Sequence, residues 1–227
     1  VRCEGVGIDA GSFWIATKLR KLGDLSSLCA GEKERDESEE SQNEHSKKQQ
    51  VLERQEMILL RGDCLIAQMA KAVEFMHEHL NYTHNDIKPS NFFLSDDRVD
   101  LGDFETALVH GDTSRKLVAW SDGFAAPEVM EFVAEMRIPG PKPSLPTPYS
   151  CKSDVFSLGR VFKVLFMKGS GDETLLLPKF APLLERMLAH GPSERPTMQE
   201  VVAEVMKLVA VDRQRAVEQP RIRTAGC

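Results

Sequence analysis

Hydrophobic positions recur at helical spacing through most of the second half of the chain. The segment from Asp154 to Met167 is apolar almost all round, which predicts a core helix. Amphipathic helices are expected over Phe180–Ala189 and Thr197–Val209. Between Cys64 and Leu80, four apolar residues follow one another at spacings of three and four, which predicts one buried helical face: Leu65, Met69, Val73 and Met76.

Short apolar runs outside these helices predict strands. They cover Phe13–Thr17, Phe92–Leu94 and Val99–Leu101. Long helices with so few and such short strands indicate a mainly α (α+β) fold, helical with short β-hairpins.

Polar and proline-rich stretches divide the chain. Residues 31–50 are almost entirely polar and cannot bury apolar surface, so we expect a disordered acidic loop. Residues 139–148 carry five prolines, which predicts a loop without regular structure. The polar segment Arg213–Arg223 is expected to fray. These breaks predict four parts: 1–30, the insertion 31–50, the main helical part 51–210, and a polar tail over 211–227.

Composition narrows the class of protein. The 227 residues suffice for one large or two small domains, and a hydrophobic content of 41% is ordinary for a globular protein. A net charge of −6 argues against nucleic acid as the main partner, and no apolar run is long enough for a transmembrane helix. The chain opens without a charged-then-apolar leader, so any targeting peptide is expected to be absent or to lie upstream. Five cysteines without metal-ligand spacing argue against a disulfide framework or a zinc site and fit a reducing compartment.

Several motifs that carry chemistry follow one another in a fixed order. The string from His84 to Asn91 (HNDIKPSN) has the form H-R-D-L-x-x-x-N, Asp103-Phe104-Glu105 is similar to D-F-G, and Ala126-Pro127-Glu128 matches A-P-E. Asp154 and Arg195 follow in the same order. A single triplet is weak evidence, because an aspartate often just starts or caps a turn. The ordered set is specific, and from Leu65 to Met206 the chain resembles the large C-terminal lobe of a eukaryotic protein kinase of the serine/threonine type.

The resemblance implies ATP- and Mg²⁺-dependent phosphoryl transfer to a protein hydroxyl. Asp86 would be the catalytic base, and Lys88 would place a cation on the transferred phosphoryl group. Asn91 and Asp103 would bind the metal through oxygen atoms. Ser121 stands where the family places a hydroxyl that hydrogen-bonds to the catalytic Asp and Lys.

The same resemblance implies structural roles for five further residues. His84 would pack beneath Phe104, and Glu128 would form a buried ion pair with Arg195. Asp154 would hold the backbone of the catalytic loop, the name used here for the string from His84 to Asn91.

Two alignments with the family remain open for residues 1–30. Gly5–Ala10 could be a glycine-rich phosphate loop, with Ile15–Lys18 as the following lysine-bearing strand. Gly5 and Lys18 are only 13 residues apart, which favours Phe13–Thr17 as the last strand of the small lobe. Residues 1–30 would then be a remnant of that lobe, without its phosphate loop and ATP-anchoring lysine. The implied ATP-binding residues are the gatekeeper, the hinge, the ribose-facing acid and one strand residue, namely Thr17, Lys18, Arg20, Asp24 and Phe93.

Two departures from the family pattern bear on function. Asn85 replaces an arginine that, in the family, binds the phosphorylated activation loop. Activation by phosphorylation of that loop is therefore less expected for this chain. Glu105 replaces a glycine. Glutamate resists backbone angles that glycine permits and adds negative charge near the implied metal ligand, which argues against in-and-out motion of this segment and against an unaltered metal geometry.

A narrower resemblance and two other functions stay open. The acidic insertion, the string Gly123–Glu128 and the proline loop together are similar to the apicomplexan rhoptry kinase family, of which part lacks a glycine loop and part is catalytically dead. The alternatives to a kinase are a pseudokinase that serves as a protein-binding scaffold and a fragment without an independent role. A protein substrate is the expected partner. Location is cytoplasmic by default, or secreted from a rhoptry-type organelle if the narrower resemblance holds.

Overall fold

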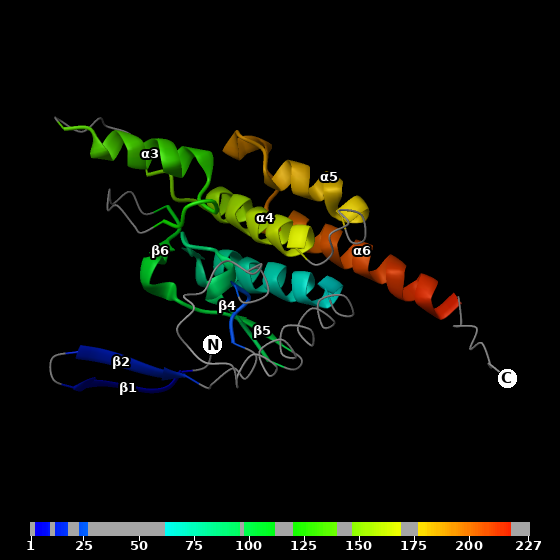
Figure 1. Ribbon diagram of the computed structural model, residues 1–227, viewed down its shortest axis with the longest axis horizontal. Helices are drawn as coiled ribbons and strands as arrows, with labels where there is room; N and C mark the ends of the chain where they lie inside the picture. Colours follow the sequence, from blue (N-terminus) through cyan, green and yellow to red (C-terminus); the bar gives the residue numbers. More distant parts are fainter. Residues whose placement is uncertain are drawn as a thin grey trace, which may run out of the picture.

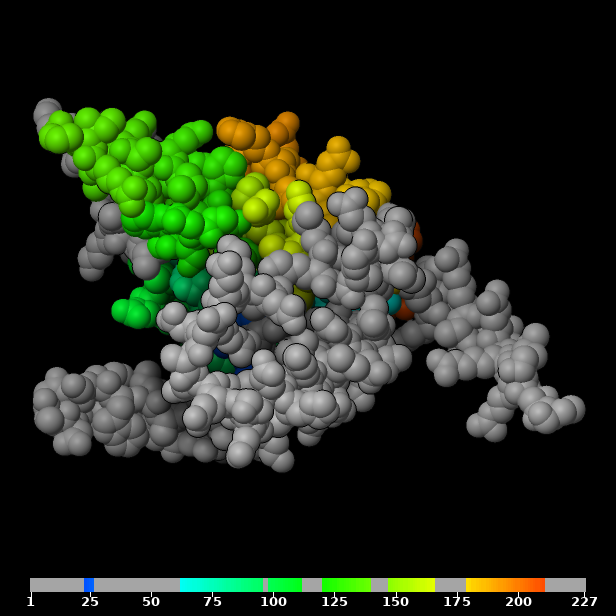
Figure 2. Space-filling model, viewed as in Figure 1, coloured from blue at the N-terminus to red at the C-terminus, as the bar shows by residue number. Residues whose placement is uncertain are grey.

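The computed structural model describes residues 3–9, 12–17, 23–26, 62–95, 98–111, 120–139, 147–168 and 177–218. This part of the chain is mostly helical, with short two-stranded sheets (Figure 1). Helix α4 (Cys151–Lys168) crosses the middle of the fold and packs against α5 (Leu177–Met187), which in turn contacts α6 (Met198–Glu218). In Figure 2, α3 (Pro127–Arg137, green) and α5 with the turn after it (yellow to orange) form neighbouring parts of the visible surface.

The helix over residues 62–75 buries the face that its sequence predicts. Leu65, Met69, Val73 and Met76 are at most 5% exposed and belong to one core together with residues of α4, α5 and α6. The chain continues as a π-helical turn, η1 (Met76–Leu80), which ends at Asn81 in the left-handed conformation (φ 58°). Asparagine tolerates this conformation better than most residues. The predicted helix over Cys64–Leu80 is therefore confirmed, with a wider last turn.

Helix α4 owes its central place to its sequence. It is buried along its length through Val155, Leu158, Val161 and Phe162. Gly159 faces α5, where an added Cβ would lie 3.1 Å from atoms of Met187 and Leu188. The missing side chain therefore allows α4 and α5 to pack closely.

Three antiparallel pairs of strands complete the described part. They are β1 (Cys3–Asp9) with β2 (Ser12–Thr17), β3 (Tyr82–Thr83) with β6 (Leu108–Val109), and β4 (Phe92–Leu94) with β5 (Val99–Leu101). The bounds of β4 and β5 equal the predicted ones, and the strand predicted over Phe13–Thr17 is β2.

The hairpin of β1 and β2 bears on the two alignments for the first residues. Gly5 pairs with Ala16 and Gly7 pairs with Trp14, so both glycines lie inside a strand ladder. An antiparallel hairpin is compatible with either alignment, so both alignments stay predictions.

Several helix boundaries differ from the prediction. Helix α4 begins at Cys151 rather than Asp154. Helix α5 begins at Leu177 rather than Phe180, and α6 continues to Glu218 rather than ending at Val209. The expected fraying from Arg213 is therefore wrong as far as Glu218. This stretch is rich in arginine, glutamine and alanine, which favour helix, and the first helix breaker is Pro220.

Two predicted segments fall wholly or mostly outside the described residues. These are the acidic insertion 31–50 and most of the proline-rich segment 139–148. Among the helices that the structure describes, none is both long and apolar enough to cross a membrane.

Candidate active site

The loop between β3 and β4 carries the predicted catalytic base. Asp86 is 7% exposed, and both of its carboxylate oxygens are engaged. Lys88 Nζ donates to Oδ2 over 2.6 Å, and Ser121 Oγ donates to Oδ1 over 2.7 Å. The predicted contact of Ser121 with the aspartate is thus present, while the described contacts include none from Ser121 to Lys88.

The two predicted metal ligands differ in their surroundings. Asn91 is buried in the 3₁₀ turn η2 (Pro89–Asn91), where its Nδ2 donates to the carbonyl of Asp86 over 2.8 Å. Asp103 lies exposed after β5, and within the described residues its carboxylate makes no hydrogen bond or ion pair.

The donor set fits a magnesium ion. One amide oxygen and one uncommitted carboxylate are hard ligands of the kind that Mg²⁺ prefers. No group of three or more His, Cys, Asp or Glu side chains in the described residues is arranged to hold a metal ion. Magnesium in phosphoryl-transfer sites needs no such group, because one or two protein ligands suffice when substrate phosphates and water supply the others.

Glu105 adopts an ordinary backbone conformation despite occupying a glycine position of the family. It lies in the 3₁₀ turn η3 (Phe104–Thr106), and the left-handed residue is Asp103, with φ at 61°. A large side chain at position 105 therefore causes no backbone strain in this conformation.

A pair of hydrogen bonds ties this turn to the catalytic loop. Asn85 Nδ2 donates to the carbonyl of Thr106 over 2.8 Å, and Thr106 Oγ1 donates to the carbonyl of His84 over 2.7 Å. Asn85 itself is left-handed, with φ at 68°. The residue that replaces the family's arginine thus forms a neutral link, which sequence reasoning missed because Thr106 belongs to no motif.

His84 packs against Phe104 as predicted. Their ring centroids lie 5.5 Å apart, and His84 is fully buried, with Nε2 3.1 Å from the carbonyl of Gly102. This contact joins the catalytic loop to the segment that carries Asp103.

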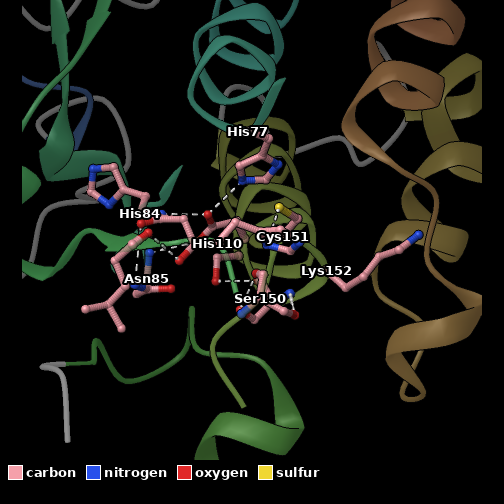
Figure 3. Close-up of polar contacts among 12 residues, drawn as sticks. His77, His84, Asn85, His110, Ser150, Cys151 and Lys152 are labelled. Atoms are coloured by element: carbon pink, nitrogen blue, oxygen red, sulfur yellow. Dashed lines mark hydrogen bonds and ion pairs between the residues drawn. The ribbon is translucent and has the colours of Figure 1, made fainter. Parts of the chain in front are cut away.

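Asp154 holds the backbone of the catalytic loop, also as predicted. One carboxylate oxygen accepts from the backbone N–H of His84 over 2.7 Å, and the other accepts from that of Asn85 over 2.9 Å. A third bond joins Asp154 to His77 Nε2 over 2.9 Å (Figure 3). Asp154 is 1% exposed, so all three bonds lie away from water.

His77 was missed by sequence reasoning. It lies four residues after Val73, on the same buried helical face, and this spacing is the signal that could have found it. Burial alone would lower the pKa of His77, but the hydrogen bond to Asp154 and the neighbouring Cys151 thiol raise it to about 9. The imidazole is therefore protonated at neutral pH and pairs with the Asp154 carboxylate.

The buried ion pair predicted between Glu128 and Arg195 is present. The guanidinium donates to both carboxylate oxygens, over 2.7 and 2.8 Å, and it stacks 4.9 Å from the ring centroid of Phe156. Its remaining N–H groups donate to three backbone carbonyls, those of Lys152, Ala189 and His190. The Arg195 side chain is completely buried, and all of its donors have partners.

Two of the predicted ATP-binding residues lie together. Asp24 pairs with Phe93 in an isolated β-bridge, flanked by a hydrogen bond from Leu94 N to the carbonyl of Gly23 over 2.8 Å. One Asp24 carboxylate oxygen accepts from the backbone N–H and the hydroxyl of Ser26, which closes a local turn. Thr17 is the last residue of β2, but its side chain lies outside the described part of the chain. Lys18 and Arg20 lie outside it altogether.

Comparison with known proteins yields kinase-like relatives. The chain is 32% identical over 165 residues to eukaryotic translation initiation factor 2-alpha kinase 3 of Bos taurus. The aligned region covers 63% of the chain and 14% of that protein. The chain is 34% identical over 139 residues to serine/threonine-protein kinase WNG1 of Toxoplasma gondii, covering 60% and 19%. It is 30% identical over 153 residues to bradyzoite pseudokinase 1 of Toxoplasma gondii, covering 61% and 38%. The chain thus matches well under half the length of each relative.

The family itself follows from a longer match. The family model of the protein kinase domain matches residues 37–171, which is more than half of the chain. That range includes the catalytic loop, the Asp103 segment, Glu128 and Asp154, whose contacts are described above. The chain therefore belongs to the protein kinase domain family.

Proposed function

We propose that this protein transfers a phosphoryl group from Mg²⁺-ATP to a serine or threonine hydroxyl of a protein. The observation that carries the proposal is the orientation of Asp86, whose two carboxylate oxygens are held by Lys88 and Ser121. Phosphoryl transfer asks little covalent chemistry of an enzyme and depends on positioning and charge neutralisation. A base fixed from two sides meets the first of these needs.

Asp86 and Lys88 would divide the work at the reacting atoms. Asp86 would accept the proton of the substrate hydroxyl and orient its oxygen, and a positioned base of this kind contributes about 10²- to 10⁴-fold in rate. Lys88, 26% exposed and 2.6 Å from Asp86, would place its cation on the transferred phosphoryl group. A lysine two residues after the base is the pattern of the serine/threonine branch in the resemblance described above.

Nucleotide and metal would be held by other residues. Asn91 and Asp103 would supply oxygen ligands to Mg²⁺, which neutralises phosphate charge when bound. Phe93 and Asp24 would face the nucleoside, since the bridge between them joins the two segments that the resemblance assigns to it. Thr17, Lys18 and Arg20 complete the proposed set.

A pseudokinase is the second candidate, and Glu105 favours it. Its carboxylate adds negative charge two residues after Asp103, where the family has a glycine. The similarity to a protein named a pseudokinase supports this candidate. In that case the same fold would hold a protein partner without phosphoryl transfer.

The narrower kinship is also a proposal. Two of the relatives come from Toxoplasma gondii, which supports the resemblance to the apicomplexan rhoptry kinase family. Secretion from a rhoptry-type organelle would follow from that kinship, whereas a cytoplasmic location is the default for a kinase without it.

Transfer of labelled phosphate to a generic Ser/Thr substrate tests the enzyme proposal, with the full-length protein and with Mg²⁺ or Mn²⁺. Asp86→Asn should reduce transfer by about 10²-fold or more and leave nucleotide affinity nearly unchanged. Asp63→Asn is the matched control, because it removes a half-buried carboxylate whose partner is Lys179 of α5. No transfer by the unmodified protein with either metal would favour the pseudokinase. Full activity of Asp86→Asn would show that another residue is the base.

A further inference from the structure

Cys151, at the first turn of α4, lies between two imidazole rings that come from other parts of the chain (Figure 3). Its Sγ is 3.4 Å from Nδ1 of His110, which follows β6. On the other side lies His77 of η1, whose interaction with the Cys151 thiol helps to raise the pKa of this histidine. The proposed phosphoryl-transfer chemistry uses neither Cys151 nor His110.

The second ring carries an uncommitted nitrogen. His77 Nε2 is bonded to Asp154, whereas Nδ1 is buried and makes no hydrogen bond of normal geometry within the described residues. The side chain of His77 is only 2% exposed. Figure 3 shows this free edge of the ring turned toward the sulfur of Cys151. A buried polar group that is left unpaired costs free energy, and a thiolate at Cys151 would accept from this N–H of the protonated ring.

The charges around the sulfur are mainly positive. Cys151 begins a helix of 18 residues, whose N-terminus carries partial positive charge. His77 is protonated at neutral pH, since its pKa is raised to about 9. The Asp154 carboxylate is already bonded to His77 and to two backbone N–H groups, and Lys152 donates to the carbonyl of Arg195. Reactive cysteines occur in partly exposed surroundings of this electropositive kind.

The contact between the Cys151 sulfur and His110 lies on the exposed side of the site. Cys151 is half-buried, and His110 is exposed on the turn after β6. A small reagent can therefore approach along the exposed imidazole, while the buried imidazole forms the rear of the site.

We propose that Cys151 is a site of reversible thiol–disulfide exchange with small acidic disulfides, of which glutathione disulfide is the probe. The Cys151 thiolate attacks one sulfur of the disulfide, a new S–S bond forms, and the old one breaks. The second half of the disulfide leaves as a thiolate and takes a proton from solvent. Cys151 is thereby oxidised and the departing half reduced, and attack by a free thiol reverses the step.

The experiment compares Cys151 with Cys64 in the same molecule. Cys64, on the helix over 62–75, is also half-buried, and no contact with an imidazole is recorded for it within the described part of the chain. The reduced full-length protein is incubated with glutathione disulfide, and adducts are mapped by peptide mass spectrometry over time. We expect the adduct at Cys151 to form about tenfold faster than at Cys64, and dithiothreitol to remove it. Equal rates at the two cysteines would overturn the proposal.

A variant tests the role of the imidazole. His110→Asn replaces an exposed ring and should lower the Cys151 rate about threefold or more, while the Cys64 rate stays unchanged. Thermal unfolding followed by circular dichroism checks that the variant is folded. An unchanged Cys151 rate in the folded variant would overturn the assigned role of His110. Alkylation of Cys151 by iodoacetamide without any reaction with glutathione disulfide would overturn the exchange itself.

Discussion

Asp154 is the single residue on which most of the geometry of the catalytic loop depends. It accepts hydrogen bonds from the backbone of His84 and Asn85 and from the His77 ring, and all of them are shielded from water. The backbone bonds turn residues 84 and 85 so that Asp86 faces Lys88 and Ser121. The histidine adds a positive charge that balances the buried carboxylate, as a buried charge requires.

The charge on His77 makes stability depend on pH. Its pKa is about 9 in the folded protein and 6.5 ordinarily, so the folded state binds the proton more tightly. The contribution to the free energy of unfolding is complete below pH 6.5 and is lost as pH rises through 9. It is of order 3 kcal/mol, taken from the difference between the two pKa values. Melting temperatures of the unmodified protein should therefore fall from pH 6.5 to 9.5.

His77→Gln supplies the comparison for this pH effect. Glutamine keeps a donor near Asp154 but does not titrate, so the difference in stability between the two proteins should shrink as pH rises. A difference that stays constant across this range would show that His77 is not charged in the folded state.

Ser121 tests how far the orientation of Asp86 matters. Ser121→Ala removes the donor to Asp86 Oδ1, and we expect kcat for phosphoryl transfer to fall about tenfold, since a less well oriented base is a weaker catalyst. Ser121→Thr keeps the hydroxyl and should retain most of the activity. Both variants should unfold at nearly the temperature of the unmodified protein. Equal activity of the alanine and threonine variants would contradict the positioning role.

At this scale, sequence predicted the residues whose chemistry depends on type and spacing. The contacts of Ser121 with Asp86 and of Asp154 with the backbone of the catalytic loop are the predicted ones, because the motifs fix both the type and the spacing of these residues. The bond from Asn85 to Thr106 and the group around Cys151 could not be predicted. They depend on how side chains from separate elements turn toward one another, which no local pattern encodes.

At the scale of elements, Arg195 joins helices that are far apart in the sequence. Its guanidinium binds Glu128 at the start of α3 and the carbonyl of Lys152 in α4. It also binds the carbonyls of Ala189 and His190, which directly follow α5. Fully satisfied and buried, this cation fixes the segment after Ser121 to the helical core. Sequence predicted the ion pair, but not the carbonyls that complete it.

Removing either partner of this pair should destabilise the protein strongly. Arg195→Ala removes the cation that pairs with Glu128 and a donor to each of three carbonyls, and the loss of one partner of a buried ion pair costs about 3–5 kcal/mol. Arg186→Ala is the matched control, because its pair with Glu204 is 48% and 33% exposed and is worth about 0–1 kcal/mol. Urea unfolding measures both. Similar losses for the two variants would contradict the special role of Arg195.

Element boundaries show why sequence predicts cores better than ends. The buried faces of the helix over 62–75 and of α4 follow from hydrophobic spacing, and both are confirmed. The end of α6 does not, because charged and polar residues interrupt the apolar pattern from Asp212 onward. Their intrinsic helix propensity, together with the absence of a breaker before Pro220, carries the helix on to Glu218.

At the scale of the whole molecule, short hairpins bring the catalytic loop and the Asp103 segment together. The pairing of β3 with β6 and of β4 with β5 closes the chain around residues 84–91 and 102–107. The backbone N–H of Gly102 donates to the carbonyl of Asn91 over 3.0 Å, which links the two proposed metal ligands through their own loops. The helical core supports both loops, since Asp154 of α4 holds the backbone of His84 and Asn85.

This arrangement predicts that Asp103 can be removed without harm to the fold. Its carboxylate is exposed and has no partner within the described residues, whereas truncating Asn91 would also break its bond to the Asp86 carbonyl. Asp103→Ala should therefore leave the unfolding temperature nearly unchanged. Because it removes a proposed ligand, the tighter ATP binding that Mg²⁺ confers should be lost together with phosphoryl transfer.

Two titrations of the full-length protein with ATP, with and without Mg²⁺, separate these effects. Asp103→Ala should bind ATP as the unmodified protein does when Mg²⁺ is absent, and more weakly when it is present. Glu105→Gln is the matched control, since it removes the neighbouring exposed carboxylate to which no metal is assigned. If Glu105→Gln instead abolished the effect of Mg²⁺ and Asp103→Ala did not, the metal would be held by the residue that departs from the family pattern. The chain would then bind nucleotide in a way that its motifs do not predict.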